Sequence, residues 1–238
     1  MLDNSKSSEK LIFRKVSDRH ISIKKLCEVG VYLPHTSNIL DFINEGKEAI
    51  LVEPEPKSIQ AIEVYFKGNT NITLIPVAIY SYNGRLTLSQ TGASTFVTEL
   101  SKSPALINDN YKIEDKKNID VACKLFSEID PEDIDLISID TEGSEWYVLL
   151  TMISRPKVIS IETHGKYYLN PFLVEIKQWM RLNNYAIWFK DGSDSVYARK
   201  DAIKVRKIEK LQLQLTNFSL WLSSLKKYLK PSRWMRVS

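Results

Sequence analysis

Cysteine is scarce in this sequence: its 238 residues include only Cys27 and Cys123, both inside apolar runs. Two such residues argue against a disulfide framework and a thiolate metal site, and they indicate a reducing compartment. No stretch approaches the roughly 18 uninterrupted apolar residues of a membrane span. Residues 1–10 are polar, so we expect no secretory signal and a cytoplasmic protein.

Most of the chain carries no excess of positive charge. The net charge is +4, but residues 199–238 carry +9, with eleven Lys and Arg residues against Asp201 and Glu209, and the remainder carries −5. We therefore expect no nucleic-acid partner. The composition, 43% hydrophobic and 26% charged, is typical of a globular protein, and the length suits one domain with a short appendage.

Strand-like apolar runs alternate with helix-like segments between residues 24 and 200. The pattern predicts strands at 24–29, 49–52, 72–79, 136–139 and 158–161, helices at about 36–46, 57–67 and 170–183, and a closing antiparallel hairpin of 185–189 with 195–198. The first of these helices would begin at the hydroxyl of Thr36 or Ser37. This alternation indicates an α/β fold with a doubly wound, mostly parallel sheet.

Two further features lie after the third predicted strand. Asn83-Gly84 stands between residues 79–80 and 86–88, which predicts a β-hairpin. Residues 89–118 have the polar composition of a long loop. We divide the chain into a polar N-terminal segment (1–20), the α/β domain (21–200) and a basic, amphipathic C-terminal helix and tail (201–238).

Polar residues follow four of the predicted strands at the point where each ends. They are Glu28 and Gly30, Glu53, Asp140, and Glu162 with His164. Ligands of a doubly wound sheet bind outside the carboxyl ends of its strands. Glu53 follows Gly30 by 23 residues, the usual spacing of an acid that accepts hydrogen bonds from ribose hydroxyls.

The loop that begins at Gly30 has one glycine and lacks the G-x-G-x-x-G pattern of a dinucleotide site. A pyrophosphate needs close backbone approach, whereas S-adenosylmethionine carries no phosphate. This contrast favours S-adenosylmethionine over NAD. His35 and Thr36 on the same loop, and Ala78 near the end of the third predicted strand, complete the expected cofactor contacts.

Carboxylates suit a site for a sulfonium cofactor, and a hydroxyl that attacks the methyl group must lose its proton. We assign catalytic roles to Asp140, Glu142 and His164. His164 is included because imidazole titrates in the useful range. We predict no metal; a metal-assisted route through these same three residues stays an alternative without a supporting spacing.

Residues 135–145 (DLISIDTEGSE) resemble a motif of the FkbM-type methyltransferase family, and residues 155–164 and 92–95 (GAST) are similar to further parts of it. The resemblance covers about residues 24–200. It implies a class I, Rossmann-like fold that uses S-adenosylmethionine to O-methylate sugars or other small hydroxyl compounds. It also implies that Glu28, Gly30 and Glu53 hold the cofactor and that Asp140 lies against its methionine half.

This sequence lacks the second glycine and the asparagine of the family's first loop, where Thr36 and Ser37 are the candidate substitutes. Two alternative functions stay open: another nucleotide-dependent α/β enzyme, using a sugar nucleotide or NAD, and a catalytically degenerate scaffold.

Beyond residue 203 the apolar residues follow a helical three-four spacing: Ile208, Leu211, Leu215, Phe218, Leu222, Leu225 and Leu229. Three interpretations of this stripe stay open. It packs on the domain, it pairs with a second copy of the chain, or it lies on an anionic membrane at the inner face.

Overall fold

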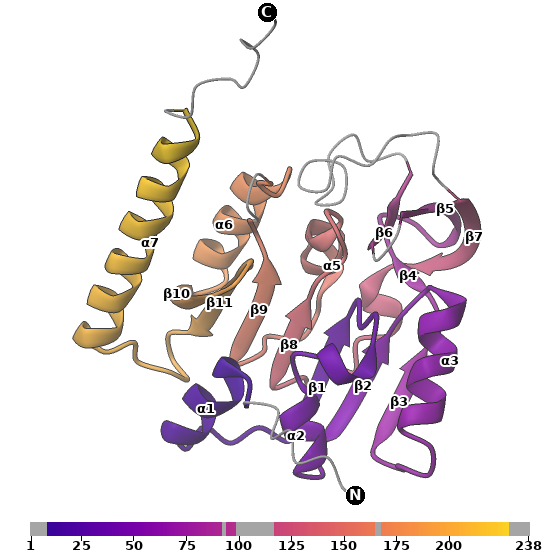
Figure 1. Cartoon of the computed structure of the whole chain (residues 1–238). Helices are drawn as coiled ribbons and strands as arrows, with labels where there is room; N and C mark the ends of the chain where they lie inside the picture. Colours follow the sequence, from indigo (N-terminus) through magenta and orange to yellow (C-terminus); the bar gives the residue numbers. More distant parts are fainter. Residues whose placement is uncertain (1–8, 92–93, 99–116, 165–167, 229–238) are drawn as a thin grey trace, which may run out of the picture.

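The computed structural model describes residues 9–91, 94–98, 117–164 and 168–228. Its central sheet has seven strands in the order β10-β11-β9-β8-β1-β2-β3 (Figure 1). The strands are β1 (Lys25–Val29), β2 (Glu48–Val52), β3 (Ile72–Ile75), β8 (Leu136–Ile139), β9 (Val158–Glu162), β10 (Tyr185–Asp191) and β11 (Asp194–Arg199). Strands β9, β8, β1, β2 and β3 run parallel, and β11 and β10 complete the sheet as an antiparallel hairpin.

The chain builds this sheet outward from β1 in both directions. It first adds β2 and β3 on one side and then returns to place β8 and β9 on the other, so strand order reverses between β1 and β8. The predicted doubly wound α/β fold, its parallel strands and its closing hairpin are therefore confirmed.

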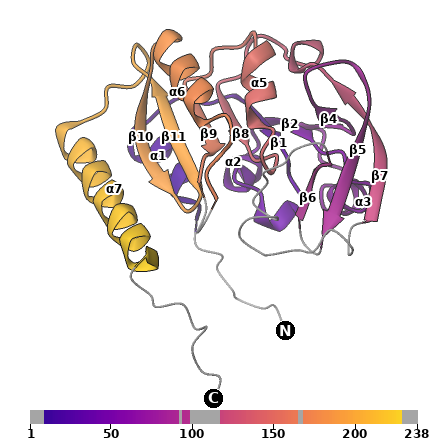
Figure 2. The ribbon, with the colours of Figure 1, turned by 90° about the horizontal axis from the view of Figure 1, so that it is seen from above.

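Helices cover both faces of the sheet (Figure 2). Alternate residues of one strand point to opposite faces. Leu26 accordingly packs with α1 (Leu11–Asp18), α2 (Leu40–Asn44) and α3 (Pro56–Tyr65), while Cys27 packs with α5 (Glu145–Thr151) and α6 (Leu173–Leu182). Strands buried on both faces need unbroken apolar runs, which is why 136–139 (LISI) was recognisable in the sequence.

Helix α1 lies inside the segment that we set apart as residues 1–20. Its residues Ile12, Phe13 and Val16 are buried in the same cluster as Leu26. Residues 11–18 are therefore part of the packed domain.

The single strand predicted at 72–79 is wrong. Pro76 divides it, because proline has no N–H to donate to a sheet ladder. Strand β3 stops at Ile75, and β4 (Ala78–Ile79) belongs to a second, four-stranded sheet in the order β4-β7-β5-β6.

The Asn83-Gly84 hairpin is also wrong, and the loop expected at 89–118 contains strand residues at 89–91, 94–97 and 117–118. Strands β5 (Gly84–Thr91) and β7 (Lys117–Lys124) pair antiparallel from Gly84 opposite Cys123 to Gln90 opposite Lys117, and β4 pairs with β7 instead of β5. The seven-residue ladder offers far more hydrogen bonds than a two-residue β4 could. Strand β6 (Ser94–Val97) also lies in the expected loop, of which residues 99–116 are outside the described part.

The helix expected from Thr36 or Ser37 begins later. A short 3-10 helix, η1 (Pro34–Thr36), comes first, and α2 starts at Leu40 without a side-chain cap. The Ser37 hydroxyl donates to the Glu28 carboxylate instead.

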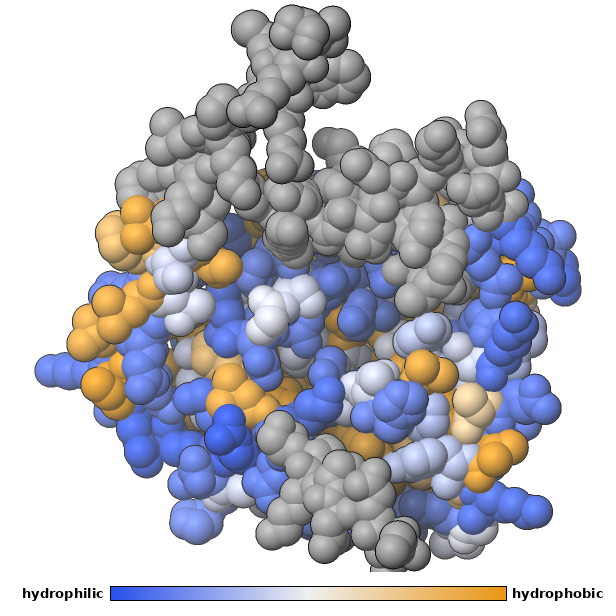
Figure 3. All heavy atoms as spheres, viewed as in Figure 1, coloured by the Kyte–Doolittle hydropathy of each residue, from blue (hydrophilic) through white to orange (hydrophobic). Residues whose placement is uncertain are grey.

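The C-terminal helix α7 (Lys207–Tyr228) contacts the edge strand β10 near its own first turn. Glu209 joins it to the domain by accepting hydrogen bonds from Arg19 and from Nε1 of Trp188. The stripe residues Ile208, Leu211, Leu215 and Phe218 are each more than half exposed, and Figure 3 shows hydrophobic side chains gathered along this edge of the molecule. Ile208, Leu211 and Leu215 are therefore not buried against the domain.

Within the described ranges, no helix combines the length and the apolar character that crossing a membrane requires.

Candidate functional site

A cavity of about 260 Å³ lies at the carboxyl ends of β1, β2 and β8, where the strand order reverses. Its volume is just below the roughly 300 Å³ at which small-molecule sites begin. Seven of the nine residues singled out in the sequence line it: Glu28, Gly30, Thr36, Glu53, Ala78, Asp140 and Glu142. Three of the four polar strand ends, those at Glu28, Glu53 and Asp140, thus share one cavity, and the fourth, at Glu162 and His164, does not line it.

Gly30 fixes the first loop tightly against the end of β8. It has φ +83°, and a Cβ built on it would lie 1.7 Å from the carbonyl O of Asp140. Its N–H donates to the Val52 carbonyl O at 2.9 Å, and the Asp140 N–H donates to the Val29 carbonyl O at 2.9 Å. Only glycine fits a left-handed backbone pressed against another backbone.

The Glu53 carboxylate holds the same loop from the side of β2. Its Oε2 accepts the N–H groups of Val31 at 2.9 Å and Tyr32 at 2.8 Å, and its Oε1 accepts the N–H of Glu55 at 2.9 Å. Burial raises the pKa of Glu53, and the three N–H donors oppose that rise. A carboxylate oxygen accepts about two hydrogen bonds, so Oε2 is filled and Oε1 has one site left for a ligand.

Glu28 is buried at the base of the cavity, where it anchors the chain beyond η1. Its Oε1 accepts the Asn38 N–H at 2.8 Å, and its Oε2 accepts the Ser37 hydroxyl. Burial raises the pKa of Glu28 to about 7 in spite of these two donors. The carboxyl group therefore titrates near neutrality.

Part of the apolar wall of the cavity comes from residues 96–97, which the sequence analysis placed in a loop. Val77 precedes β4, while Leu88 lies on β5 and Phe96 and Val97 lie on β6. Residues 86–88 were predicted as a strand, and β5 extends this strand to Thr91.

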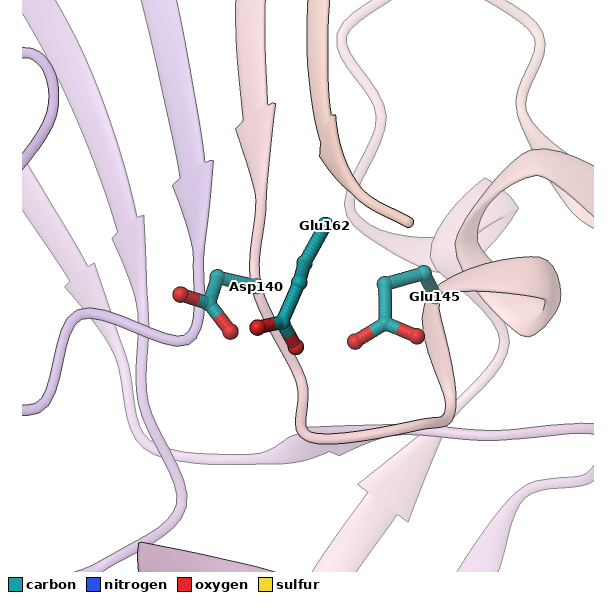
Figure 4. A group of neighbouring side chains, drawn as sticks. All are labelled: Asp140, Glu145 and Glu162. Atoms are coloured by element: carbon teal, nitrogen blue, oxygen red, sulfur yellow. The ribbon is translucent and has the colours of Figure 1, made fainter. Parts of the chain in front are cut away.

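Carboxylates dominate the side of the cavity next to β8. Asp140 and Glu142 line it, and Glu145 and Glu162 lie next to Asp140 without lining it. Figure 4 shows the carboxylate of Glu162, from the end of β9, between those of Asp140 and Glu145. Burial, followed by the negative charges of Asp194 and Glu142, raises the pKa of Asp140 well above its ordinary value.

The two predicted histidines are not at this cavity. His35 is exposed on η1, and His164 lines a separate cavity beside α6. The backbone explains the position of His164: its N–H donates to the Ser193 carbonyl O at 3.2 Å, and it forms a β-bridge with Leu169. Burial, and next the charge of Lys190, lower the pKa of His164 to about 4. His164, to which the sequence assigned a catalytic role, therefore does not line the cavity that Asp140 lines.

Comparison with known proteins gives the family. The model of the methyltransferase FkbM domain matches residues 28–187, well over half of the chain. This chain belongs to the FkbM methyltransferase family. The matched region contains the whole of the cavity lining described above. No curated protein matches the chain.

Several solved structures resemble this FkbM chain at low sequence identity. A putative caffeoyl-CoA O-methyltransferase from Staphylococcus aureus has 10% identity and a TM-score of 0.45, covering 79% of this chain and 80% of that one. The fibrillarin pre-rRNA processing protein of Methanococcus jannaschii has 13% identity and a TM-score of 0.38, covering 74% of this chain and 66% of that one. The precorrin-6y C5,15-methyltransferase of Geobacter metallireducens has 14% identity and a TM-score of 0.36, covering 81% and 87%.

Proposed function

We propose that this FkbM-family chain transfers a methyl group from S-adenosylmethionine to a hydroxyl oxygen of a carbohydrate or another small molecule. One observation carries the proposal. A single cavity at the reversal of strand order is lined by the loop that begins at Gly30, by an apolar wall and by several carboxylates. The family and the fold imply S-adenosylmethionine as the methyl donor.

The shape and chemistry of the cavity fit such a cofactor. Val77, Leu88 and Phe96 offer an apolar wall for a purine ring. The remaining accepting site on Glu53 Oε1 suits one ribose hydroxyl, since Oε2 is filled by backbone N–H groups. The carboxylates of Asp140 and Glu142 favour the positive sulfonium and ammonium groups of the methionine half.

The same carboxylates suit the proton transfer. The bound cofactor supplies an electrophilic methyl group, whose bond to sulfur breaks as its bond to the acceptor oxygen forms. The acceptor hydroxyl must release a proton at this step. Asp140 is the candidate base, because its raised pKa makes its carboxylate a stronger base than an ordinary aspartate.

Calorimetry with S-adenosylhomocysteine and with NAD tests the cofactor. We expect the chain to bind S-adenosylhomocysteine and not NAD, and Glu53→Ala to weaken this binding at least tenfold. Glu63→Ala, at an exposed glutamate on α3, is the matched control and should bind as the unchanged chain does. Binding of NAD would support another nucleotide-dependent enzyme, and binding of neither would support a scaffold.

Methylation with a ¹³C-labelled methyl donor tests the acceptor. Carbohydrates and other hydroxyl compounds, with amine analogues beside them, are incubated with the chain, and the carbon chemical shift identifies the atom that bears the new methyl group. We expect an O-methyl product. Transfer to nitrogen alone would contradict the proposed acceptor chemistry while leaving the methyl donor intact.

A further inference from the structure

Three carboxylates converge beside the cofactor cavity from different parts of the chain. Asp140 follows β8, Glu145 begins α5, and Glu162 ends β9. One oxygen from each lies within 4.8 Å of the other two. Two oxygens that share a metal ion at about 2.1–2.6 Å lie no more than about 4–5 Å apart, so one ion can reach all three.

Within the described part of the chain, Glu162 has one buried oxygen without a hydrogen-bond donor. Its side chain is 7% exposed, and its Oε2 accepts no hydrogen bond from any described residue. Figure 4 shows that its carboxylate is directed into the space between the other two. A buried carboxylate oxygen without a donor is costly, and such groups are normally hydrogen-bonded or bound to a cation.

In the described ranges, no salt bridge from a lysine, arginine or histidine reaches Asp140, Glu145 or Glu162. Burial, followed by the charges of Asp140 and Glu145, raises the pKa of Glu162 to about 11. The cluster is thus unfavourable for three negative charges unless a positive ion or added protons neutralise it.

Glu145 differs from the other two, since its environment holds it in place. Its Oε1 accepts the N–H groups of Thr141 at 2.9 Å and Gly143 at 3.0 Å, and its Oε2 accepts Nδ2 of Asn170 at 2.5 Å. Oε2 keeps one accepting site. Ligands that are positioned by neighbouring hydrogen bonds in this way are typical of metal centres.

We propose that Asp140, Glu145 and Glu162 form a binding site for one hard divalent cation, such as Mg²⁺, Mn²⁺ or Ca²⁺. The all-oxygen ligand set selects this class of ion over the softer transition metals. Asp140 lines the cofactor cavity, so the ion would lie at its border. If the proposed function holds, the ion would favour loss of the acceptor proton, because a divalent cation lowers the pKa of a bound hydroxyl group.

The binding of Mn²⁺ to the chelator-treated chain, without methyl donor or acceptor, tests the site. Electron paramagnetic resonance of free Mn²⁺ should show one ion bound per chain, displaced by excess Mg²⁺ or Ca²⁺. Glu162→Gln should weaken the affinity at least tenfold. Glu175→Gln, at an exposed glutamate on α6, should leave it unchanged.

The folded state of the variant is checked by thermal unfolding. Glu162→Gln replaces a buried acid whose Oε2 receives no hydrogen bond from a described residue, so its melting temperature without metal should equal or exceed that of the unchanged chain. Added Mn²⁺ should raise the melting temperature of the unchanged chain and not of the variant. If Glu162→Gln does not fold, Asp140→Asn takes its place and should show the same loss.

The outcomes separate this proposal from the methyl-transfer proposal. No bound Mn²⁺, or equal affinity in the unchanged chain and Glu162→Gln, would overturn the cation site and indicate that protons neutralise the cluster. Calorimetry with S-adenosylhomocysteine on the same samples reports the cofactor site independently. Mn²⁺ binding without nucleoside binding would keep the cation site and reject the proposed function.

Discussion

Replacing Gly30 with alanine should destabilise the chain and displace the end of β8. Two costs follow from the structure. The left-handed φ of +83° costs about 1–2 kcal/mol for a residue with a Cβ. The contact of 1.7 Å with the Asp140 carbonyl O forces a backbone shift, for which overpacking data suggest about 1–3 kcal/mol more. The total is about 2–5 kcal/mol, a large part of the roughly 5–15 kcal/mol that stabilises a typical protein.

Two other glycines provide controls for the first cost alone. Gly46 has φ +80° and Gly68 has φ +84°, and a Cβ on either would meet no atom within 4 Å. Alanine at these positions should therefore cost only about 1–2 kcal/mol. The difference between Gly30→Ala and the two controls isolates the contact with Asp140.

Urea unfolding measures the three stabilities, and calorimetry with S-adenosylhomocysteine measures the site. We expect Gly30→Ala to be the least stable variant and to bind the nucleoside at least tenfold more weakly, while Gly46→Ala and Gly68→Ala bind it normally. The reasoning is refuted if Gly30→Ala matches Gly68→Ala in both measurements, since the loop would then not depend on close approach to β8.

Three further predictions concern other parts of the structure. The pKa of Glu28 in the folded state, about 7, exceeds its ordinary value of 4.5. The free energy of unfolding should therefore fall by about 3 kcal/mol as the pH rises from 4.5 to 7. Glu28→Gln should remove this fall in urea unfolding. Glu209→Ala should speed amide hydrogen exchange in α7, because Arg19 and Trp188 lose their shared acceptor. If the α7 stripe pairs two copies of the chain, light scattering should report a dimer, and Leu215→Glu should convert it to a monomer.

Each of these predictions has a contradicting result. An unchanged pH dependence in Glu28→Gln would reject the titration of Glu28 near neutrality; Glu63→Gln is its exposed control. Equal exchange rates in Glu209→Ala would show that α7 is held by other contacts. A monomeric unchanged chain would reject self-pairing and favour the membrane alternative for the stripe.

The parallel strands were predictable because they are buried on both faces. A segment such as Leu136–Ile139 is apolar except for the small Ser138, and that continuity is visible without knowledge of its neighbours. The same rule placed Glu28, Glu53 and Asp140 at the strand ends that share the cavity. Local pattern was sufficient there, since the fold rule supplies the geometry.

The second sheet was not predictable in the same way. Its register depends on pairing between β5 and β7, whose paired residues Gly84 and Cys123 are far apart in the chain. The Asn83-Gly84 pair gave a local hairpin signal, but the longer ladder with β7 outweighed it. Pro76 was a usable signal that the predicted third strand had to end.

The sequence also could not show in which direction a side chain at a strand end points. The strand-end rule places the backbone of His164 near the site, but hydrogen bonding to Ser193 and the bridge to Leu169 direct its imidazole to the cavity beside α6. The pairing of β9 with β11 brings Ser193 next to His164, and this pairing is not visible in the sequence.

The sequence could not distinguish the roles of the acids at the strand ends. The hydrogen bonds that each acid accepts in the structure do distinguish them. Glu53 receives three backbone N–H groups and Glu28 receives two donors, so both carboxylates are held in place and in turn hold the first loop. Among the described residues, none donates to Oε2 of the buried Glu162. An acid kept without donors inside a folded protein must obtain its stabilisation from a proton or from a bound ligand. The chemistry of this chain is therefore expected at β8 and β9, while the acids of β1 and β2 shape the cavity that the ligand enters.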